Sequence, residues 1–312
     1  MKRIVVLLGG DSPEREVSLV SGSEICKELL AQGYEAIEVD PREVGNLDTL
    51  LATLRDLNPY MVFNALHGGA GENGQLSAAL DLAGFSYSGS GYKASCLAMD
   101  KYISKLIAAA EGLPLAKHIL IRGDLLGDYQ DPEDLQGIPQ NLGFPIIVKP
   151  NAAGSSVGIT RVDALGELKP AVQHALEYCQ EVLLEEFIEG REITLTVLDG
   201  IALPVVEIKP HSGWYDYRNK YTKGNTEYLA PAPITEAEKQ LTQLYAERIF
   251  KAMGCSGYAR VDFRLREGIP YFLEVNTLPG MTPLSLTPMA ARAAGLSFGE
   301  LLTRIIAITM RN

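Results

Sequence analysis

Two facing carboxylates in a predicted hairpin are the side chains best suited to chemistry in this sequence. The segment 257–276, GYARVDFRLREGIPYFLEVN, alternates apolar and polar residues with period two on both arms, as strands with one buried face do. If the arms turn at the glycine between them, Asp262 lies opposite Glu274 and Arg260 opposite Asn276, with paired Cβ atoms about 5 Å apart. Carboxylates that close repel unless a positive charge lies between them.

A divalent cation would remove this repulsion. The oxygens of Asp262, Glu274 and Asn276, with room for water and phosphate oxygens, suit Mg²⁺ bound together with a nucleotide. The alternative is a solvated polar face on which a neighbouring arginine balances the charge. The hairpin therefore indicates metal-assisted phosphate chemistry, with that alternative open.

A glycine-rich loop is a second candidate for phosphate binding. Residues 151–159, NAAGSSVGI, follow a predicted strand that ends in Lys149. The loop glycines would let backbone N–H groups point at a polyanion, while Ser155 and Ser156 add hydroxyl donors and Lys149 adds a positive charge. The sequence has neither a GxxxxGK[ST] motif nor a GxGxxG motif after its first strand, so it predicts no P-loop. An ordinary turn is the alternative.

Acidic residues follow an apolar run in 182–193, VLLEEFIEGREI. Glu185, Glu186 and Glu192 could accept hydrogen bonds from an adenine amine and from ribose hydroxyls. A solvated acidic rim is the alternative interpretation.

Two further candidates lie in loops near the N-terminus. Glu14 opens a helix just after a glycine pair, where a carboxylate also has a purely structural role because the helix dipole favours it. His67 is the only histidine in a glycine-rich loop that follows a strand, LHGGAGENG, and this placement favours a function.

Three units would position these residues. In the first, predicted strands 4–8, 36–39 and 61–63 alternate with helices 14–32 and 47–57, which indicates a parallel sheet that binds ligands at the carboxyl ends of its strands. The second contains helix 100–110, strand 146–149, a strand near residue 159, helix 164–179 and strand 182–187, and the third starts with strands 193–198 and 201–208. Residues 210–231 are polar and aromatic without a clear period, which is typical of a functional lid.

Composition describes an ordinary globular protein of 312 residues, with 46% hydrophobic and 21% charged residues. A net charge of -11 argues against a nucleic-acid partner. The sequence has no signal-peptide core and no apolar run long enough to span a membrane, so we expect a cytoplasmic protein without a membrane partner. The four cysteines are isolated and the four histidines lack metal-binding spacing, which predicts neither a zinc site nor a disulfide framework.

Several segments together resemble the signatures of D-alanine–D-alanine ligases, in the expected order and over nearly the whole chain. They are LLGGDSPEREVSLVSG, ALHGGAGENG, MDKYISK, FPIIVKPNAAGSSVGI, YDYRNKY, GYARVDF and LEVNTLPGMTPLSLTPMAA. The resemblance implies an α/β (α+β) ATP-grasp fold with a Rossmann-like domain at 1–97. Two α+β domains, 98–190 and 191–312, would sandwich ATP, and the segment 210–231 would be the lid.

The resemblance also implies roles for single residues. ATP would be bound by Lys101, Lys149, Gly154, Ser155, Ser156, Val157, Glu185, Ile188 and Glu192. Two Mg²⁺ ions, for which Mn²⁺ could substitute, would be held by Asp262, Glu274 and Asn276. The first D-alanine would be bound by Glu14, with His67 nearby and Ser155 and Tyr221 bonded to Glu14. The second would be held by Lys220, Ser285 and Leu286, and the oxyanion by Arg260 and Gly280.

The implied reaction is ATP-dependent synthesis of D-alanyl-D-alanine through D-alanyl phosphate, for peptidoglycan, in a homodimer. Tyr221 favours an amine acceptor, because the resemblance associates phenylalanine there with D-lactate. At Asn151, Ala152 and Ala153 many relatives carry a charged residue instead, so loop closure could be held differently. The alternatives are a D-alanyl-D-lactate or D-alanyl-D-serine ligase, and a non-catalytic nucleotide sensor with the same fold.

Overall fold

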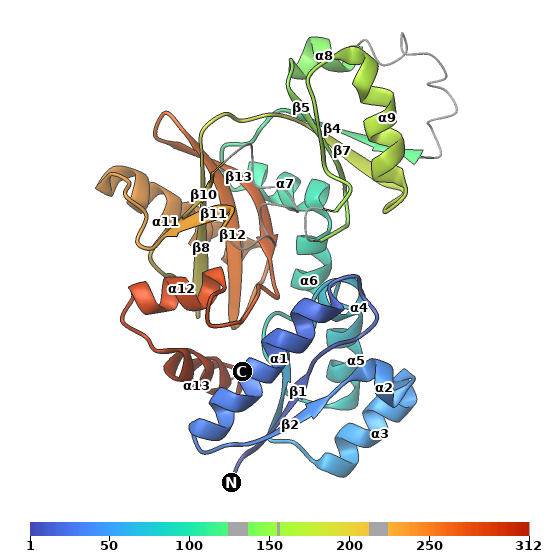
Figure 1. Cartoon of the computed structure of the whole chain (residues 1–312), viewed down its shortest axis with the longest axis vertical. Coiled ribbons are helices and arrows are strands. Elements are labelled where there is room, and N and C mark those ends of the chain that lie inside the picture. Colours follow the sequence, from blue (N-terminus) through green and yellow to red (C-terminus); the bar gives the residue numbers. More distant parts are fainter. Residues whose placement is uncertain (124–136, 155–156, 212–223, 312) are drawn as a thin grey trace.

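The computed structural model describes residues 1–123, 137–154, 157–211 and 224–311. Its strands form three sheets, one in each of the three predicted units (Figure 1). The first is parallel and the other two are antiparallel. This mixed architecture is the α/β (α+β) arrangement expected from the sequence.

The first sheet has the order β2-β1-β3 and is parallel throughout, as the alternation of strands and helices predicted. Its strands are β1 (Arg3–Leu7), β2 (Glu35–Val39) and β3 (Met61–Asn64). The accompanying helices are α1 (Arg15–Ala31), α2 (Pro41–Val44), α3 (Leu47–Leu57), α4 (Gly69–Glu72), α5 (Gln75–Ala83) and α6 (Tyr92–Met99). The loops after β1 and β3 carry Glu14 and His67, so both residues lie at the carboxyl edge of this sheet.

The central sheet has the order β4-β7-β5-β6. It comprises β4 (His118–Arg122), β5 (Ile146–Pro150), β6 (Thr160–Val162) and β7 (Glu181–Glu186), with helices α8 (Gly137–Leu142) and α9 (Leu165–Leu176). Apolar residues of these strands and helices form a core of their own. The helix predicted to reach residue 179 ends at Leu176.

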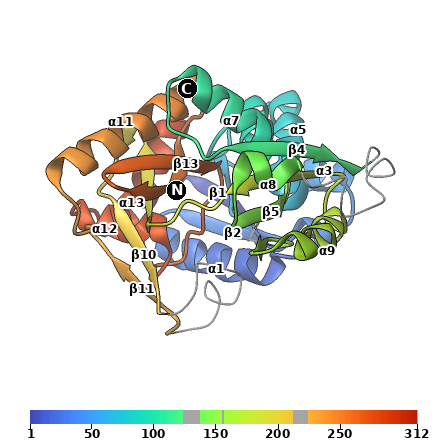
Figure 2. The same cartoon turned by 90° about the horizontal axis from the view of Figure 1, so that it is seen from above.

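The large sheet has the order β11-β10-β8-β12-β13, and β9 pairs with β8. Its strands are β8 (Arg191–Leu198), β9 (Ile201–Ala202), β10 (Val206–Pro210), β11 (Thr226–Leu229), β12 (Tyr258–Arg266) and β13 (Ile269–Asn276). Figure 2 shows β10, β11 and β13 on one side of the molecule and β4 and β5 on the other. The helices of this unit are α11 (Glu236–Ala252), α12 (Leu286–Ala293) and α13 (Phe298–Thr309).

The predicted hairpin register is confirmed. In β12 and β13, Asp262 pairs with Glu274 and Arg260 pairs with Asn276. A bulge follows Asp262, so the register shifts by one residue toward the turn. The period-two pattern near the open end was therefore sufficient to place the four polar side chains opposite each other.

Two predictions for the third unit were wrong in part. The strand expected at 201–208 is divided into β9 and β10, because Pro204 between them lacks the N–H group that a continuous ladder requires. Part of the expected lid is regular structure, since Thr226–Leu229 forms β11 and pairs with β10. Residues 212–223 of the lid lie outside the described residues.

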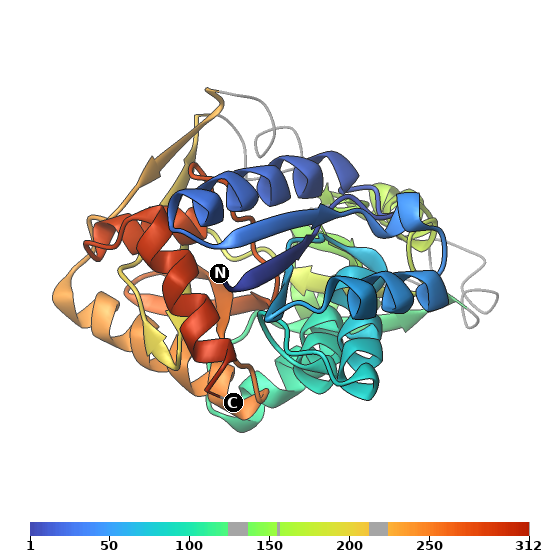
Figure 3. The ribbon, with the colours of Figure 1, turned by 90° about the horizontal axis from the view of Figure 1, so that it is seen from below.

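Packing joins parts of the chain that are distant in sequence. Ile4 and Ile25 of the first unit share one core with Leu301 and Ile305 of α13, and Figure 3 shows α13 beside the first sheet. Helix α7 (Lys101–Ala110) contributes Ala108 to the core of the large sheet. The domain limits 1–97, 98–190 and 191–312 stay a prediction.

None of the helices in the described ranges is long and apolar enough to cross a membrane.

Candidate active site

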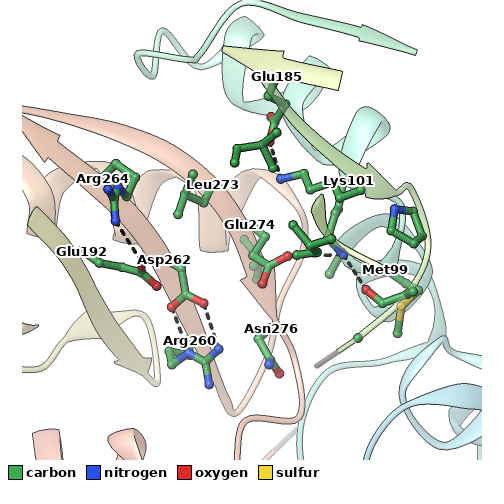
Figure 4. A pocket seen from close by; sticks show the side chains of 18 of the residues that line it. Met99, Lys101, Glu185, Glu192, Arg260, Asp262, Arg264, Leu273, Glu274 and Asn276 are labelled. Carbon is green, nitrogen blue, oxygen red and sulfur yellow. Dashed lines mark hydrogen bonds and ion pairs between the residues drawn. The ribbon is translucent and has the colours of Figure 1, made fainter. Parts of the chain in front are cut away.

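A pocket lies between the central sheet and the large sheet, and side chains of both sheets line it (Figure 4). Many predicted site residues are among its lining residues: Glu14, Lys101, Lys149, Gly154, Val157, Glu185, Ile188, Glu192, Arg260, Asp262, Glu274 and Asn276. The fold therefore brings together residues that the sequence separates by up to about 260 positions.

One side of the pocket, which we call the lysine wall, consists of Lys101 on α7, Lys149 on β5 and Glu185 on β7, with the fully buried Lys105 of α7 behind them. The Glu185 carboxylate lies between two ammonium groups, forming ion pairs with Lys149 and with Lys105, whose Nζ is 2.6 Å from Glu185 Oε1. Burial alone would raise the pKa of Glu185, but the two lysines outweigh it and lower this pKa to about 2. The carboxylate is therefore charged at neutral pH.

The opposite side, which we call the carboxylate wall, consists of Glu192 on β8, Arg260 and Asp262 on β12, and Glu274 and Asn276 on β13. Arg260 donates to both oxygens of Asp262, at 2.9 and 2.8 Å. Lys101 reaches across from the lysine wall, and its Nζ is 3.3 Å from Glu274 Oε2. Burial opposes the charge of Glu274, but the cations around it lower its pKa well below the ordinary value.

The donor set of the carboxylate wall fits a divalent cation. Part of the alternative expected from the sequence is present, because Arg260 offsets the charge of Asp262, but both side chains are buried rather than solvated. However, Asn276 Oδ1 is buried and has no hydrogen-bond partner among the described residues. A buried oxygen of this kind needs a donor or a cation. The described ranges contain no group of three or more His, Cys, Asp or Glu residues suited to a metal. The amide oxygen of Asn276 would add a third ligand to Asp262 and Glu274.

Glu192 differs from the other buried carboxylates. Burial raises its pKa to about 7, although Arg264 Nη1 lies 3.0 Å from its Oε2 and opposes the shift. Arg264 also donates to the carbonyl oxygen of Ile188 and lies over the ring of Phe187. The segment that joins β7 to β8 is thereby fixed against β12, beside the pocket.

The base of the glycine-rich loop is held by Asn151. Its Nδ2 donates to Asp100 and to Glu181, at 2.9 and 3.0 Å, and its Oδ1 accepts from the Tyr102 N–H. Lys101 Nζ donates to the carbonyl oxygen of Ala153 at 2.7 Å. A neutral amide with satisfied hydrogen bonds therefore anchors the start of the loop.

Glu14 lies where the first unit meets this loop. A Cβ atom on Gly154 would come within 2.8 Å of Glu14 Oε2, and one on Gly68 within 2.7 Å. Only glycine allows the carboxylate to approach both backbones this closely. Glu14 also lines the pocket, and its role in substrate recognition stays a prediction.

The remaining predicted residues are not among those that line the pocket. His67 is buried, and its ring nitrogens lie 3.1 Å from Leu278 O and 3.2 Å from Ser21 Oγ. Gly280 lies next to Ser285, whose Oγ is 3.0 Å from a Cβ position on that glycine, and Leu286 begins α12. Their substrate contacts stay predictions. Four further predicted residues lie outside the described ones: Ser155, Ser156, Lys220 and Tyr221.

Sequence reasoning missed Lys105, Arg264 and Thr194. Thr194 Oγ1 donates to Asp262 Oδ1 at 2.5 Å, so it orients that carboxylate from β8. Lys105 lies four residues after Lys101, which places both on one face of α7. That spacing was the available signal, whereas the partners of Arg264 and Thr194 depend on the register of β8 against β12.

Two antiparallel sheets with a pocket between them, lysines on one side and carboxylates on the other, define an ATP-grasp fold. The family model described as D-ala D-ala ligase C-terminus matches residues 107–307. A D-alanine–D-alanine ligase from Nitrosospira multiformis is 41% identical over 307 residues, which are 98% of this chain and 96% of the relative. The chain belongs to the D-alanine–D-alanine ligase family.

Solved structures agree with this assignment. The crystal structure of D-alanine–D-alanine ligase from Bacillus anthracis complexed with ATP has a TM-score of 0.85 at 33% identity, and the match covers 100% of this chain and 98% of that one. The VanG D-Ala:D-Ser ligase from Enterococcus faecalis has a TM-score of 0.84 at 32% identity, with 99% of both chains covered.

Proposed function

We propose that this chain joins two D-alanines to D-alanyl-D-alanine at the expense of ATP. The observation that carries this proposal is the pocket in which Lys101 and Lys149 face Asp262, Glu274 and Asn276. Lysines there suit the phosphates of ATP, and the oxygen ligands suit the Mg²⁺ that accompanies a nucleotide. Because the product is a precursor of peptidoglycan, the reaction belongs to cell-wall synthesis.

The reaction has two displacement steps. A carboxylate oxygen of the first D-alanine attacks the γ-phosphorus of ATP, which gives D-alanyl phosphate and releases ADP. The neutral amine of the second D-alanine then attacks the acyl carbon and the C–O bond to phosphate breaks. The peptide bond forms, and inorganic phosphate and one amine proton are released. Both steps depend on positioning and charge neutralisation rather than on a covalent protein nucleophile.

The chain supplies these functions from different elements. Lys101 and Lys149 bind the phosphates, and Glu14 binds the ammonium of the first D-alanine. Arg260, with the Gly280 amide, stabilises the negative charge that develops on the acyl oxygen in the second step. Ser285, Leu286 and Lys220 hold the carboxylate of the second D-alanine.

Asp262, Glu274 and Asn276 would hold Mg²⁺, as two ions, and Mn²⁺ has the same ligand preference. Bound there, the metal would neutralise phosphate charge and so make the γ-phosphorus more electrophilic. The buried, unpartnered Oδ1 of Asn276 supports this assignment.

The adenosine half of ATP would lie along the segment that joins β7 to β8. We assign adenine to Glu185 and the backbone near Ile188, and the ribose to Glu192. All three residues line the pocket. The loop with Gly154, Ser155, Ser156 and Val157 would cover the phosphates.

An ADP-release assay with and without D-alanine tests the proposed reaction. We expect ADP and phosphate to form only when D-alanine, ATP and Mg²⁺ are all present, together with D-alanyl-D-alanine. Release that does not depend on D-alanine, or no release at all, would contradict the proposal and favour a non-catalytic nucleotide sensor.

The acceptor is assigned to D-alanine because of Tyr221. A D-Ala:D-Ser ligase has the same fold, so the fold alone does not select the acceptor. We expect purified protein to prefer D-alanine over D-lactate and D-serine at neutral pH, and Tyr221→Phe to increase the share of D-lactate product. Product with D-lactate but none with D-alanine would refute this assignment.

We also propose that the protein is a cytoplasmic homodimer, as the resemblance implies. Light scattering of the purified protein should give twice the 33.9 kDa mass of one chain. A monomeric mass would refute the dimer.

A further inference from the structure

Lys105 is a charged residue enclosed in the molecule. Its side chain has no exposed surface and ranks among the largest fully buried ones. Lysine is almost never buried to this degree without a partner. Here Nζ is 2.6 Å from Glu185 Oε1, and it donates to the carbonyl oxygens of Phe272 and Leu273, both at 3.3 Å.

These contacts join the two walls of the pocket. Glu185 lies on β7 in the lysine wall, whereas Phe272 and Leu273 directly precede Glu274 on β13 in the carboxylate wall. Lys101, one turn earlier on the same helix, contacts Glu274 and the glycine-rich loop. Helix α7 therefore presents two ammonium groups that connect β7, β13 and the loop.

Lys105 also affects the charge balance around Glu185. Burial lowers the pKa of Lys105, but the Glu185 carboxylate 2.6 Å away favours its ammonium form. Glu185 also forms an ion pair with Lys149, so the three side chains with both lysines protonated carry one net positive charge. Without the Lys105 ammonium, the Glu185 carboxylate would neutralise Lys149 alone. Lys149 lines the pocket, but Lys105 does not, so the net charge is available to a ligand at Lys149.

We propose that Lys105 is a positioning residue of the nucleotide site, which offsets the charge of Glu185 so that Lys149 attracts phosphate. This inference rests on the proposed function, because it takes the ligand at Lys149 to be the phosphates of ATP. Lys105 itself does not touch the nucleotide.

A purely structural role for Lys105 predicts a different result. A buried ion pair often stabilises a fold no better than well-packed apolar side chains do. If Lys105 only supported packing, its loss would lower the thermal midpoint of unfolding but leave the folded protein with unchanged nucleotide affinity.

The test is a comparison of ADP and adenosine binding by calorimetry, without D-alanine. Lys105→Met keeps the length of the side chain and removes its charge. We expect it to weaken ADP binding about tenfold, or about 1.4 kcal/mol, and to leave adenosine binding within about twofold. Ala108→Gly, on the same buried side of α7, is the control for destabilisation and should bind both ligands as the wild type does.

A second experiment restores the net positive charge at Lys149. The double variant Lys105→Met/Glu185→Gln again leaves one positive charge, on Lys149, and contains no buried carboxylate with a missing partner. Because Glu185 is also assigned to adenine, both variants are compared by the ratio of their ADP affinity to their adenosine affinity, in which the adenine contact cancels. This ratio should stay within about threefold of the wild type in the double variant and should exceed the wild-type ratio in Glu185→Gln alone. These two variants decide the question if Lys105→Met does not fold.

The outcomes separate this inference from the proposed function. Wild-type ADP affinity in Lys105→Met, a parallel loss of adenosine binding, or no restoration in the double variant would each overturn the role of Lys105. Failure of the wild type itself to bind ADP would instead overturn the nucleotide site.

Discussion

The two walls of the pocket contain carboxylates whose pKa values are shifted in opposite directions. In the lysine wall, Glu185 lies between two ammonium groups, and its pKa falls to about 2. In the carboxylate wall, Glu192 has one arginine beside it and the carboxylates Asp262 and Glu274 nearby, and its pKa rises to about 7. Burial is common to both, so the surrounding charges determine the sign of the shift.

Because of this difference, we expect the two walls to bind ATP in different ways. The lysine wall has an excess of positive charge and can attract phosphate without help. The carboxylate wall has more negative groups than Arg260 and Arg264 offset, so it becomes complementary to phosphate only with added cations. Substitutions on the carboxylate wall should therefore affect metal-dependent steps, and those on the lysine wall should affect nucleotide affinity.

The largest effect is expected for Glu274→Gln. This change removes a charged metal ligand and leaves Lys101 without its carboxylate partner. We expect turnover to fall roughly a thousandfold or more, measured as D-alanine-dependent ADP release at saturating ATP. Cys179→Ala and the exposed Glu177→Gln should retain nearly full activity. Full activity in Glu274→Gln would refute the metal assignment.

Lys149→Met should have the next largest effect. It removes the ammonium that lines the pocket, and contacts of charged groups contribute about 1.5–3 kcal/mol each. The KM for ATP should rise roughly 10- to 100-fold, while the Mg²⁺ concentration for half-maximal activity should change little. Lys239→Met, on α11 and outside the pocket lining, serves as the control. A larger shift in the Mg²⁺ requirement than in the KM for ATP would contradict the assignment of nucleotide affinity to the lysine wall.

Periodic patterns in the sequence predicted the pairing of the site residues better than they predicted the buried contacts behind the site. Period-two alternation was enough for the pairing of Asp262 with Glu274, because register follows from the buried face of each strand. The same reasoning missed Lys105, since a helical pattern indicates which positions are buried but not which charge on another element they meet. The shared core of α1 and α13 could not be predicted either, because nothing local to either helix specifies a partner about 270 residues away.

Glu192→Gln should change the pH dependence of stability. The pKa of Glu192 in the folded protein, about 7, lies above its ordinary value of 4.5, so the folded state binds this proton more tightly than the unfolded chain. The contribution of Glu192 to the free energy of unfolding is therefore greatest below pH 4.5 and is lost as the pH rises to about 7.

Urea unfolding of the metal-free protein between about pH 5 and 8 would measure this loss. We expect the wild type to lose about 1–3 kcal/mol relative to Glu192→Gln over that range. The exposed Glu177 provides the control, and its Gln variant should follow the wild type at every pH. A constant difference between the wild type and Glu192→Gln would mean that Glu192 titrates normally, and the contrast with Glu185 would then be wrong.

The smallest effect is expected for Thr194→Val, which keeps the shape of the side chain and removes the hydroxyl that donates to Asp262. A freer Asp262 should bind Mg²⁺ less well, so the Mg²⁺ concentration for half-maximal activity should rise about three- to fivefold, or roughly 1 kcal/mol. Thr196→Val is the matched control, because its hydroxyl bonds to Thr287 rather than to a carboxylate. If both variants shift the Mg²⁺ requirement equally, the cause is packing of β8. A shift in Thr194→Val alone would show that the carboxylate wall depends on support from the strand beside it, as the lysine wall depends on Lys105.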